Sequence, residues 1–213
     1  MIRPSLLFLL LIPCAAGQWY AGAIGGVSTL SGDATAELGG ASPRTSQYKP
    51  ENGAALNLFA GRHFNDWVSV QGNYIWNRND VKLISISGES FYEQMRQSGQ
   101  QAAIADLLVY FRPRSSRIRP YLSIGTGLVS LQSESAGLTG RPGALPAPPA
   151  SFASSRPAVR FAVGMDIAVA RGWALRYSFS ETIRKNDFSA QLTPAAPRNL
   201  ANFQNLIGMV KRF

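Results

Sequence analysis

The chain has 213 residues, a formal net charge of +9, one cysteine and one histidine. A single cysteine excludes an intrachain disulfide framework, and one His plus one Cys is too few for the usual zinc sites. The Lys and Arg residues are scattered rather than clustered, which does not favour nucleic acid as a partner. Anionic lipid headgroups and lipopolysaccharide phosphates suit a basic balance equally well.

Residues 1–17 read as a secretory signal peptide. Arg3 supplies the positive start, residues 5–13 are a short apolar stretch, and small residues follow, so cleavage is expected just before Gln18. The apolar stretch is too short for a spanning helix. A lipidated Cys14 is the alternative, but a proline precedes it where a small residue is expected. The mature domain is therefore predicted to be 18–213.

Apolar residues recur at every second position along most of the mature chain, which indicates β-strands. Eight strands are predicted: 18–30, 54–64, 67–79, 101–112, 118–132, two within 158–184, and 201–213. At about ten residues each, they have the length that a tilted strand needs to cross a bilayer. No later segment holds 18 consecutive apolar residues, so no transmembrane helix is expected.

The connections between these strands alternate between short and long. Short ones lie near 65–66, 113–117 and 171–172, and long ones are expected at 31–53, 80–100, 133–155 and 186–200. Outer-membrane barrels have short periplasmic turns and long extracellular loops. The sequence therefore predicts an all-β fold, an eight-stranded antiparallel up-and-down transmembrane β-barrel. The Pro-rich 133–155 connection is expected to be extended and mobile. The 80–100 connection could hold a helical turn or a strand extension.

The hairpin around 171–172 can be placed by parity, because directly opposed residues must share a face. A two-residue loop would pair Ala170 on the polar face with Trp173 on the apolar face, so it is rejected. A three-residue loop, 170–172, pairs Val169 with Trp173 and places Gly172 in the left-handed region. The same register puts Asp166 opposite Arg176 on the polar face. An outward Arg near the bilayer centre would cost about 2–4 kcal/mol, so both side chains are predicted to meet inside the barrel.

The apolar face is expected to meet lipid. Aromatic residues occur at the strand ends and suit interfacial girdles; they include Trp19, Tyr20, Phe64, Trp67, Trp76, Tyr110, Phe111, Trp173 and Phe213. The four tryptophans are the principal predicted interfacial residues. The polar face carries Gly, Ala and Ser together with Asp106, Arg160, Asp166 and Arg176, which are predicted to form a lumen ion-pair network.

The last predicted strand alternates apolar residues and ends in Phe213. It resembles the terminal signature of bacterial outer-membrane proteins. Over 18–213 the chain resembles the small eight-stranded outer-membrane barrels, the OmpA-like/OmpX-like barrel domain family, without the OmpA peptidoglycan-binding domain. The resemblance implies a location in the bacterial outer membrane, contact with its lipids and lipopolysaccharide, and recognition of the C-terminal strand by the barrel-assembly machinery.

Three functions follow as hypotheses. The first is a structural or surface-interaction role through four long extracellular loops, with a possible extracellular ligand. The second is an outer-leaflet lipid-modifying enzyme, because related barrels that deacylate lipid A use a His/Ser pair. Here His63 and Ser69 would lie at the opposite end from Glu89, Glu93 and Glu134, so no catalytic residue is predicted. The third is a narrow ion channel, which a side-chain-filled lumen disfavours. The glycine-rich segment near 22–33 lacks the lysine of a phosphate loop, and no cofactor or metal is expected.

Overall fold

The computed structural model describes residues 18–31, 34–39, 44–141, 148–188, 194–195 and 199–213. The predicted signal peptide 1–17, with Cys14, lies outside these residues. The described strands are β1 Trp19–Leu30, β2 Ala34–Leu38, β3 Arg44–Pro50, β4 Gly53–His63, β5 Val68–Ser87, β6 Ser90–Tyr110, β7 Ile118–Arg141, β8 Ser151–Ala170, β9 Trp173–Lys185 and β10 Asn199–Arg212. Among the described residues, no helix is long and apolar enough to cross a membrane.

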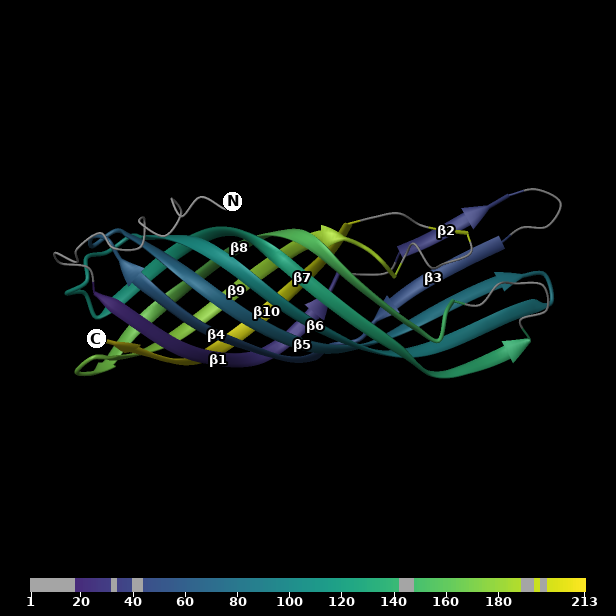
Figure 1. Cartoon of the computed structure of the whole chain (residues 1–213), viewed down its shortest axis with the longest axis horizontal. Coiled ribbons are helices and arrows are strands. Elements are labelled where there is room, and N and C mark those ends of the chain that lie inside the picture. The colour runs from purple at the N-terminus through teal and green to yellow at the C-terminus, as the bar shows by residue number, and fades with distance from the viewer. Residues whose placement is uncertain (1–17, 32–33, 40–43, 142–147, 189–193, 196–198) are drawn as a thin grey trace, which may run out of the picture.

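Eight of the strands close into a barrel. Around the ring the order is β1, β4, β5, β6, β7, β8, β9 and β10, and every neighbouring pair is antiparallel. The ring is closed between β1 and β10, whose pairing runs from Tyr20 opposite Arg212 to Leu30 opposite Asn202. The predicted eight-stranded all-β barrel is confirmed (Figure 1).

The two ends of the barrel differ. The start of β1, the end of β10 and the short turns after β4, β6 and β8 lie together, and we call this the inner end. At the other end, the outer end, β5, β6 and β7 continue well beyond the ring (Figure 1). Short turns are periplasmic in outer-membrane barrels, so the inner end faces the periplasm.

Side-chain exposure follows the predicted period of two and identifies the lipid face. On β8, Val159, Phe161 and Val163 are 42–49% exposed, while Arg160 and Ala162 between them are buried. Large apolar side chains therefore cover the outside of the ring, whereas the inside mixes polar and charged side chains with apolar ones such as Ile75 and Leu206. A soluble lipid-carrier barrel would show the reverse arrangement, so this pattern is that of a membrane barrel.

Two of the four predicted long loops are largely strand. Within 80–100, β5 continues to Ser87 and β6 begins at Ser90, so only Gly88 and Glu89 connect them, with Gly88 at φ 57°. Within 31–53 lie β2 and β3, and β3 pairs with the distal part of β5. The expectation of long loops here is wrong because the alternation continues past the membrane: Val81 and Leu83 are buried within this outer sheet.

The connection predicted at 133–155 is also shorter than expected. β7 runs to Arg141 and β8 begins at Ser151, with a β-bulge where β7 passes the Met95–Arg96 step of β6. Part of the segment that was expected to be mobile, 142–147, lies outside the described residues. The outer end thus carries a small sheet made of β2, β3 and the ends of β5, β6 and β7 (Figure 1).

The β8–β9 hairpin differs from its predicted loop by one residue. Asp166 pairs with Arg176 and Ile167 with Leu175, as the register predicts. Trp173, however, pairs with Ala170 rather than with Val169, because a bulge separates Ala168 from Ala170. The bulge adds one unpaired residue, Val169, to β8, and the pairing beyond it shifts by one position. A two-residue turn, Arg171–Gly172, then joins the strands. Gly172 has the expected positive φ, 73°.

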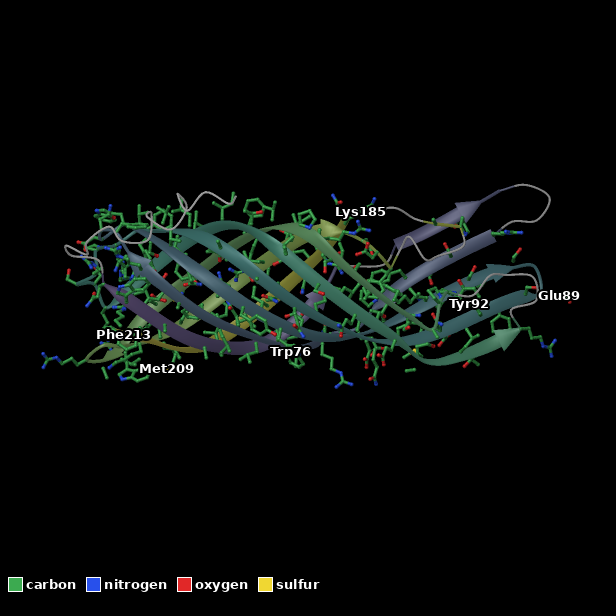
Figure 2. The ribbon with its side chains drawn as sticks, viewed as in Figure 1. Trp76, Glu89, Tyr92, Lys185, Met209 and Phe213 are labelled. Carbon is green, nitrogen blue, oxygen red and sulfur yellow. The ribbon has the colours of Figure 1, made fainter. Side chains whose placement is uncertain are left out.

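The aromatic residues divide into two groups. Trp19, Trp67 and Trp173 are exposed near the inner end, whereas Trp76 lies further along β5 on the outer wall (Figure 2). Tyr20 and Tyr110 were expected with the interfacial aromatics, but both are buried in the lumen. Successive side chains of a strand point to opposite faces, and Tyr20 and Tyr110 each lie next to an outward-facing residue, so they point into the lumen.

The cost of an outward-facing arginine should show which part of the outer wall lies in the membrane and which part belongs to the outer sheet. Ile124 on β7 and Ile86 on β5 are 51% and 48% exposed. We expect Ile124→Arg to lower the free energy of unfolding by about 2–4 kcal/mol because its charge enters hydrocarbon. Ile86→Arg should change it by less than about 0.5 kcal/mol. Urea unfolding in lipid vesicles measures both, and equal costs would contradict the placement of the belt.

Candidate functional site

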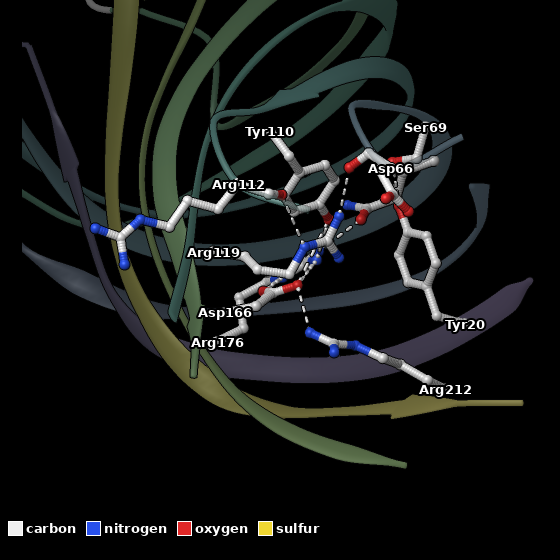
Figure 3. A network of polar contacts seen from close by, with 10 residues as sticks. Tyr20, Asp66, Ser69, Tyr110, Arg112, Arg119, Asp166, Arg176 and Arg212 are labelled. Atoms are coloured by element: carbon white, nitrogen blue, oxygen red, sulfur yellow. Dashed lines mark hydrogen bonds and ion pairs between the residues drawn. The ribbon is translucent and has the colours of Figure 1, made fainter. Parts of the chain in front are cut away.

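The lumen near the inner end is organised by a buried ion pair between adjacent strands. Arg176 on β9 donates from Nε to Asp166 Oδ1 at 2.6 Å and from Nη2 to Oδ2 at 2.9 Å. Both side chains are 1% exposed and point inward (Figure 3). Their contact follows from the hairpin register, because Asp166 and Arg176 are direct cross-strand partners.

The remaining donors of Arg176 are also used. Its Nη1 donates to Gln71 Oε1 at 2.6 Å, and its Nη2 lies 3.0 Å from the Tyr110 hydroxyl. The guanidinium carbon lies 4.7 Å from the Phe59 ring centroid and 5.0 Å from that of Tyr121. A buried charge is tolerated when it is paired and hydrogen-bonded, and this guanidinium makes four hydrogen bonds with its five N–H groups.

A second ion pair lies further along the lumen, where Arg160 Nη1 donates to Asp106 Oδ2. Asp106 faces Gly125 across β6 and β7, and a Cβ at Gly125 would collide with the Asp106 carboxylate. The four predicted residues therefore form two pairs. Gln71, opposite Asp106 and bonded to Arg176, is the side chain between them. Of these contacts, the Arg176–Gln71 hydrogen bond crosses the lumen, because β9 and β5 lie on opposite sides of the ring.

The single histidine of the sequence, His63, lies at the inner end. It is the cross-strand partner of Ser69, where β4 ends and β5 begins. The Ser69 hydroxyl lies 3.1 Å from the Tyr20 hydroxyl. The His63 ring packs against Tyr20 and Tyr110, at centroid distances of 4.7 and 5.3 Å. Among the described residues, no group of three His, Cys, Asp or Glu side chains is placed to hold a metal ion.

The outer end of the lumen is closed by an apolar cluster that the sequence analysis missed. Phe188, just beyond β9, is fully buried and stacks on Tyr48 of β3 at 5.4 Å and meets Phe152 of β8 at 5.5 Å. The other members of this cluster are Leu30, Val81, Leu83, Leu131 and Leu200. Spacing alone could not find the cluster, because its members come from six strands and a connection.

Asp187 fixes the backbone that carries Phe188. Its carboxylate accepts hydrogen bonds from Ser154 at 2.5 Å, Arg156 at 3.0 Å and Arg184 at 2.9 Å. Burial favours the neutral carboxyl, but the Ser154 hydroxyl and the two cations outweigh it and hold the pKa of Asp187 below its ordinary value. The charged form therefore anchors the closure of the outer end at neutral pH.

Arg96 performs a comparable role for the β7–β8 connection. Its guanidinium is buried and donates to Ser133, Gln94 and the carbonyls of Pro149 and Ala150. No carboxylate is among these partners. Backbone carbonyls from residues 149–150 replace one, so the arginine holds this connection over the outer sheet. Arg96 lies in the segment that was predicted to be a loop, which is why its inward direction was not foreseen.

The sequence matches the family described as the outer membrane protein beta-barrel domain over residues 6–205. The chain belongs to this family. The predicted resemblance and the outer-membrane location are thereby confirmed, together with the closed ring and the lipid-facing apolar wall. No curated protein matches the sequence significantly.

Solved structures of small outer-membrane barrels share the fold. The Neisserial surface protein A structure aligns with a TM-score of 0.56 and 12% identity, covering 93% of this chain and 100% of that one. The attachment invasion locus protein Ail of Yersinia pestis aligns at 0.48 with 14% identity, covering 92% and 99%. At 12% identity, the likeness to the Neisserial protein shows the fold alone.

Removing one member of the inner ion pair should be far more costly than removing both. We expect Asp166→Asn to lower the free energy of unfolding by about 3–5 kcal/mol, because it leaves the Arg176 charge buried without its partner. The double variant Asp166→Asn/Arg176→Gln should recover part of that loss. Urea unfolding of the single and double variants gives the coupling. Arg171→Gln, in the exposed turn at the same end, is the control, and additive losses would contradict the coupling.

Proposed function

We propose that the protein is a non-catalytic surface-interaction barrel whose outer sheet, rather than a set of flexible loops, contacts a partner protein. The observation that carries this proposal is an exposed apolar pair at the tip of that sheet. Ile86 and Phe91 are direct cross-strand partners on β5 and β6, and they are 48% and 43% exposed. They lie ten or more residues beyond Trp76, outside the lipid belt, so lipid does not explain their exposure.

Charges flank the pair. Phe91 is opposite Arg141 on β7, and Ser87, next to Ile86, is opposite Arg44 on β3. Exposed aromatic and arginine side chains are the types enriched at the centre of protein interfaces. A rigid sheet also loses less conformational freedom on binding than a loop does. These features support a protein partner at the tip.

The filled lumen supports this function over the channel. Two buried ion pairs lie in the interior, the Arg176–Gln71 hydrogen bond joins β9 to β5 across it, and the Phe188 cluster lies at the outer end. An eight-stranded barrel has an interior just wide enough for side chains to fill, which supports a plugged lumen. We therefore expect conductance near background in planar bilayers.

The enzyme alternative needs its His/Ser pair at the outer leaflet. His63 and Ser69 lie instead next to the inner turn, and the Ser69 hydroxyl is engaged by Tyr20. This placement favours a non-catalytic role for both. We further propose that residues 1–17 are removed as a signal peptide and that the mature chain is 18–213.

Lipopolysaccharide is the proposed lipid partner at the outer end. On β5, Trp76 is followed on the same face by Arg78, whose Nη2 donates to Gln97 at 2.8 Å. Two residues of strand advance about 7 Å, so an arginine follows the aromatic ring from the hydrocarbon boundary into the headgroup layer. An exposed guanidinium at that depth suits a lipid phosphate.

The interaction surface can be tested by adhesion. Cells that display the wild-type protein should bind to surfaces coated with extracellular-matrix protein or epithelial cells better than cells with an empty vector. The Ile86→Ser/Phe91→Ser variant should lose most of that gain, because its apolar contact area is removed. Lys82→Ser/Glu93→Ser, which removes an exposed ion pair from the same two strands, is the matched control. Wild-type binding equal to the vector would refute the proposal.

We also propose that Phe213 is read by the barrel-assembly machinery. Its ring is 69% exposed, and its backbone N–H donates to the Trp19 carbonyl at 2.9 Å. A side chain with so little packing contributes little to stability. Phe213→Ala should therefore lower the amount of folded protein in cell outer membranes several-fold, while refolding in detergent stays unchanged.

Heat-modifiable gel migration measures both quantities for Phe213→Ala. Met209→Ala, another outward residue of β10, is the control and should assemble normally. Equal loss of assembly in the cell and in detergent would assign Phe213 a structural role instead.

A further inference from the structure

The inner end of the barrel carries a strong excess of positive charge. Its turns and strand ends hold eight Lys and Arg residues against two acidic side chains, Asp66 and Asp166, of which Asp166 is the cross-strand partner of Arg119; the eight are Arg62, Arg112, Arg114, Arg117, Arg119, Arg171, Lys211 and Arg212. Asp66 is already engaged, because Arg114 donates to it at 2.8 Å. The short turns contain no further Asp or Glu that could pair with the other cations at this end.

Two of these cations point into the lumen. Arg119 on β7 is fully buried, and its guanidinium lies 3.9 Å from the centroid of the Tyr110 ring. Arg212 on β10 lies 3.6 Å from Asp166, and its side chain is 15% exposed. Figure 3 shows the guanidinium groups of Arg119, Arg176 and Arg212 gathered near the Asp166 carboxylate.

The charges in this cluster do not balance. Arg119, Arg176 and Arg212 are three cations, and Asp166 is the one carboxylate among them. Arg176 takes both oxygens of that carboxylate at 2.6 and 2.9 Å. Two positive charges therefore remain in excess within a largely buried space, where an uncompensated charge is costly.

Donors of the excess cations also lack protein acceptors. Arg119 uses Nε and Nη2 for the backbone carbonyls of Arg112 and Asp66, at 3.4 and 2.9 Å. Its buried Nη1 has no hydrogen-bond partner among the described residues, and the same holds for Nε and Nη2 of Arg212 and Nδ1 of His63. His63 is 1% exposed, and its ring lies 5.3 Å from the Tyr110 ring that Arg119 also contacts.

We propose that the inner end of the lumen binds a small inorganic anion, chloride or phosphate, between Arg119 and Arg212. The two guanidinium groups supply the charge, and His63, in its Nδ1–H tautomer, supplies a neutral donor. The anion compensates the excess charge and accepts the free N–H groups. Because Arg212 is partly exposed, the site is reached from the periplasmic side.

Calorimetric titration of the full chain, folded in zwitterionic micelles and sodium gluconate at constant ionic strength, tests the proposal. Chloride and inorganic phosphate are titrated separately, which distinguishes the two ligands. We expect saturable binding of one of them, weakened at least about ten-fold in Arg119→Gln because a charge-assisted hydrogen bond is lost. Arg212→Gln should show the same loss, and it carries the test if Arg119→Gln fails to fold.

Arg171→Gln is the matched control, since it removes a positive charge from the exposed turn at the same end. It should bind the anion as the wild type does. The absence of saturable binding to the wild type by either anion would overturn the proposal. A loss in Arg171→Gln equal to that in Arg119→Gln would also overturn it, because the attraction would then come from the rim as a whole.

Discussion

Closure of the sheet between β1 and β10 is the constraint on which the rest of the molecule depends. A backbone N–H or C=O that faces hydrocarbon without a partner costs several kcal/mol, so a sheet can cross a membrane only as a closed ring. Pairing from Tyr20–Arg212 to Leu30–Asn202 removes both edges. Once the ring is closed, the period of two assigns every side chain either to lipid or to the lumen.

The charged side chains that point into the lumen must then be paired. Inward positions of a narrow barrel are withdrawn from water, and this chain places arginines and aspartates there. Asp166 meets Arg176 on neighbouring strands, and Asp106 meets Arg160 from either side of Gly125, which is the register partner of both. Polar amides such as Gln71 and aromatic rings such as Tyr110 complete their hydrogen bonds. At the inner end, arginine side chains outnumber the carboxylates, so positive charge remains in excess.

Beyond the membrane, the extended strands form a separate outer sheet. β5 and β6 continue for about ten residues past Trp76, and β3 joins them on one edge. The sheet buries its own apolar side chains against Phe188, while Asp187 and Arg96 fix the connections with ionic and backbone hydrogen bonds. A barrel whose strands extend in this way carries a hydrogen-bonded sheet beyond the membrane.

The sequence by itself determined the architecture and much of the register. Period-two alternation, strand length and the positions of the short turns were enough for the eight-stranded ring, its lipid face and the pairing of Asp166 with Arg176. These are local signals, since each depends on residues within one strand or one hairpin. The positive φ at Gly172 belongs to the same class.

Only the tertiary structure decided where the strands stop and what meets across the lumen. The alternation in 80–100 was visible, but whether those residues pair depends on β3 and β7, which are distant in sequence. The bulge at Val169 altered one pairing without changing the faces, and a pattern of faces cannot detect it. Tyr20, Arg119 and Phe188 meet their partners from strands far apart in the chain, because closure of the ring brings those strands together.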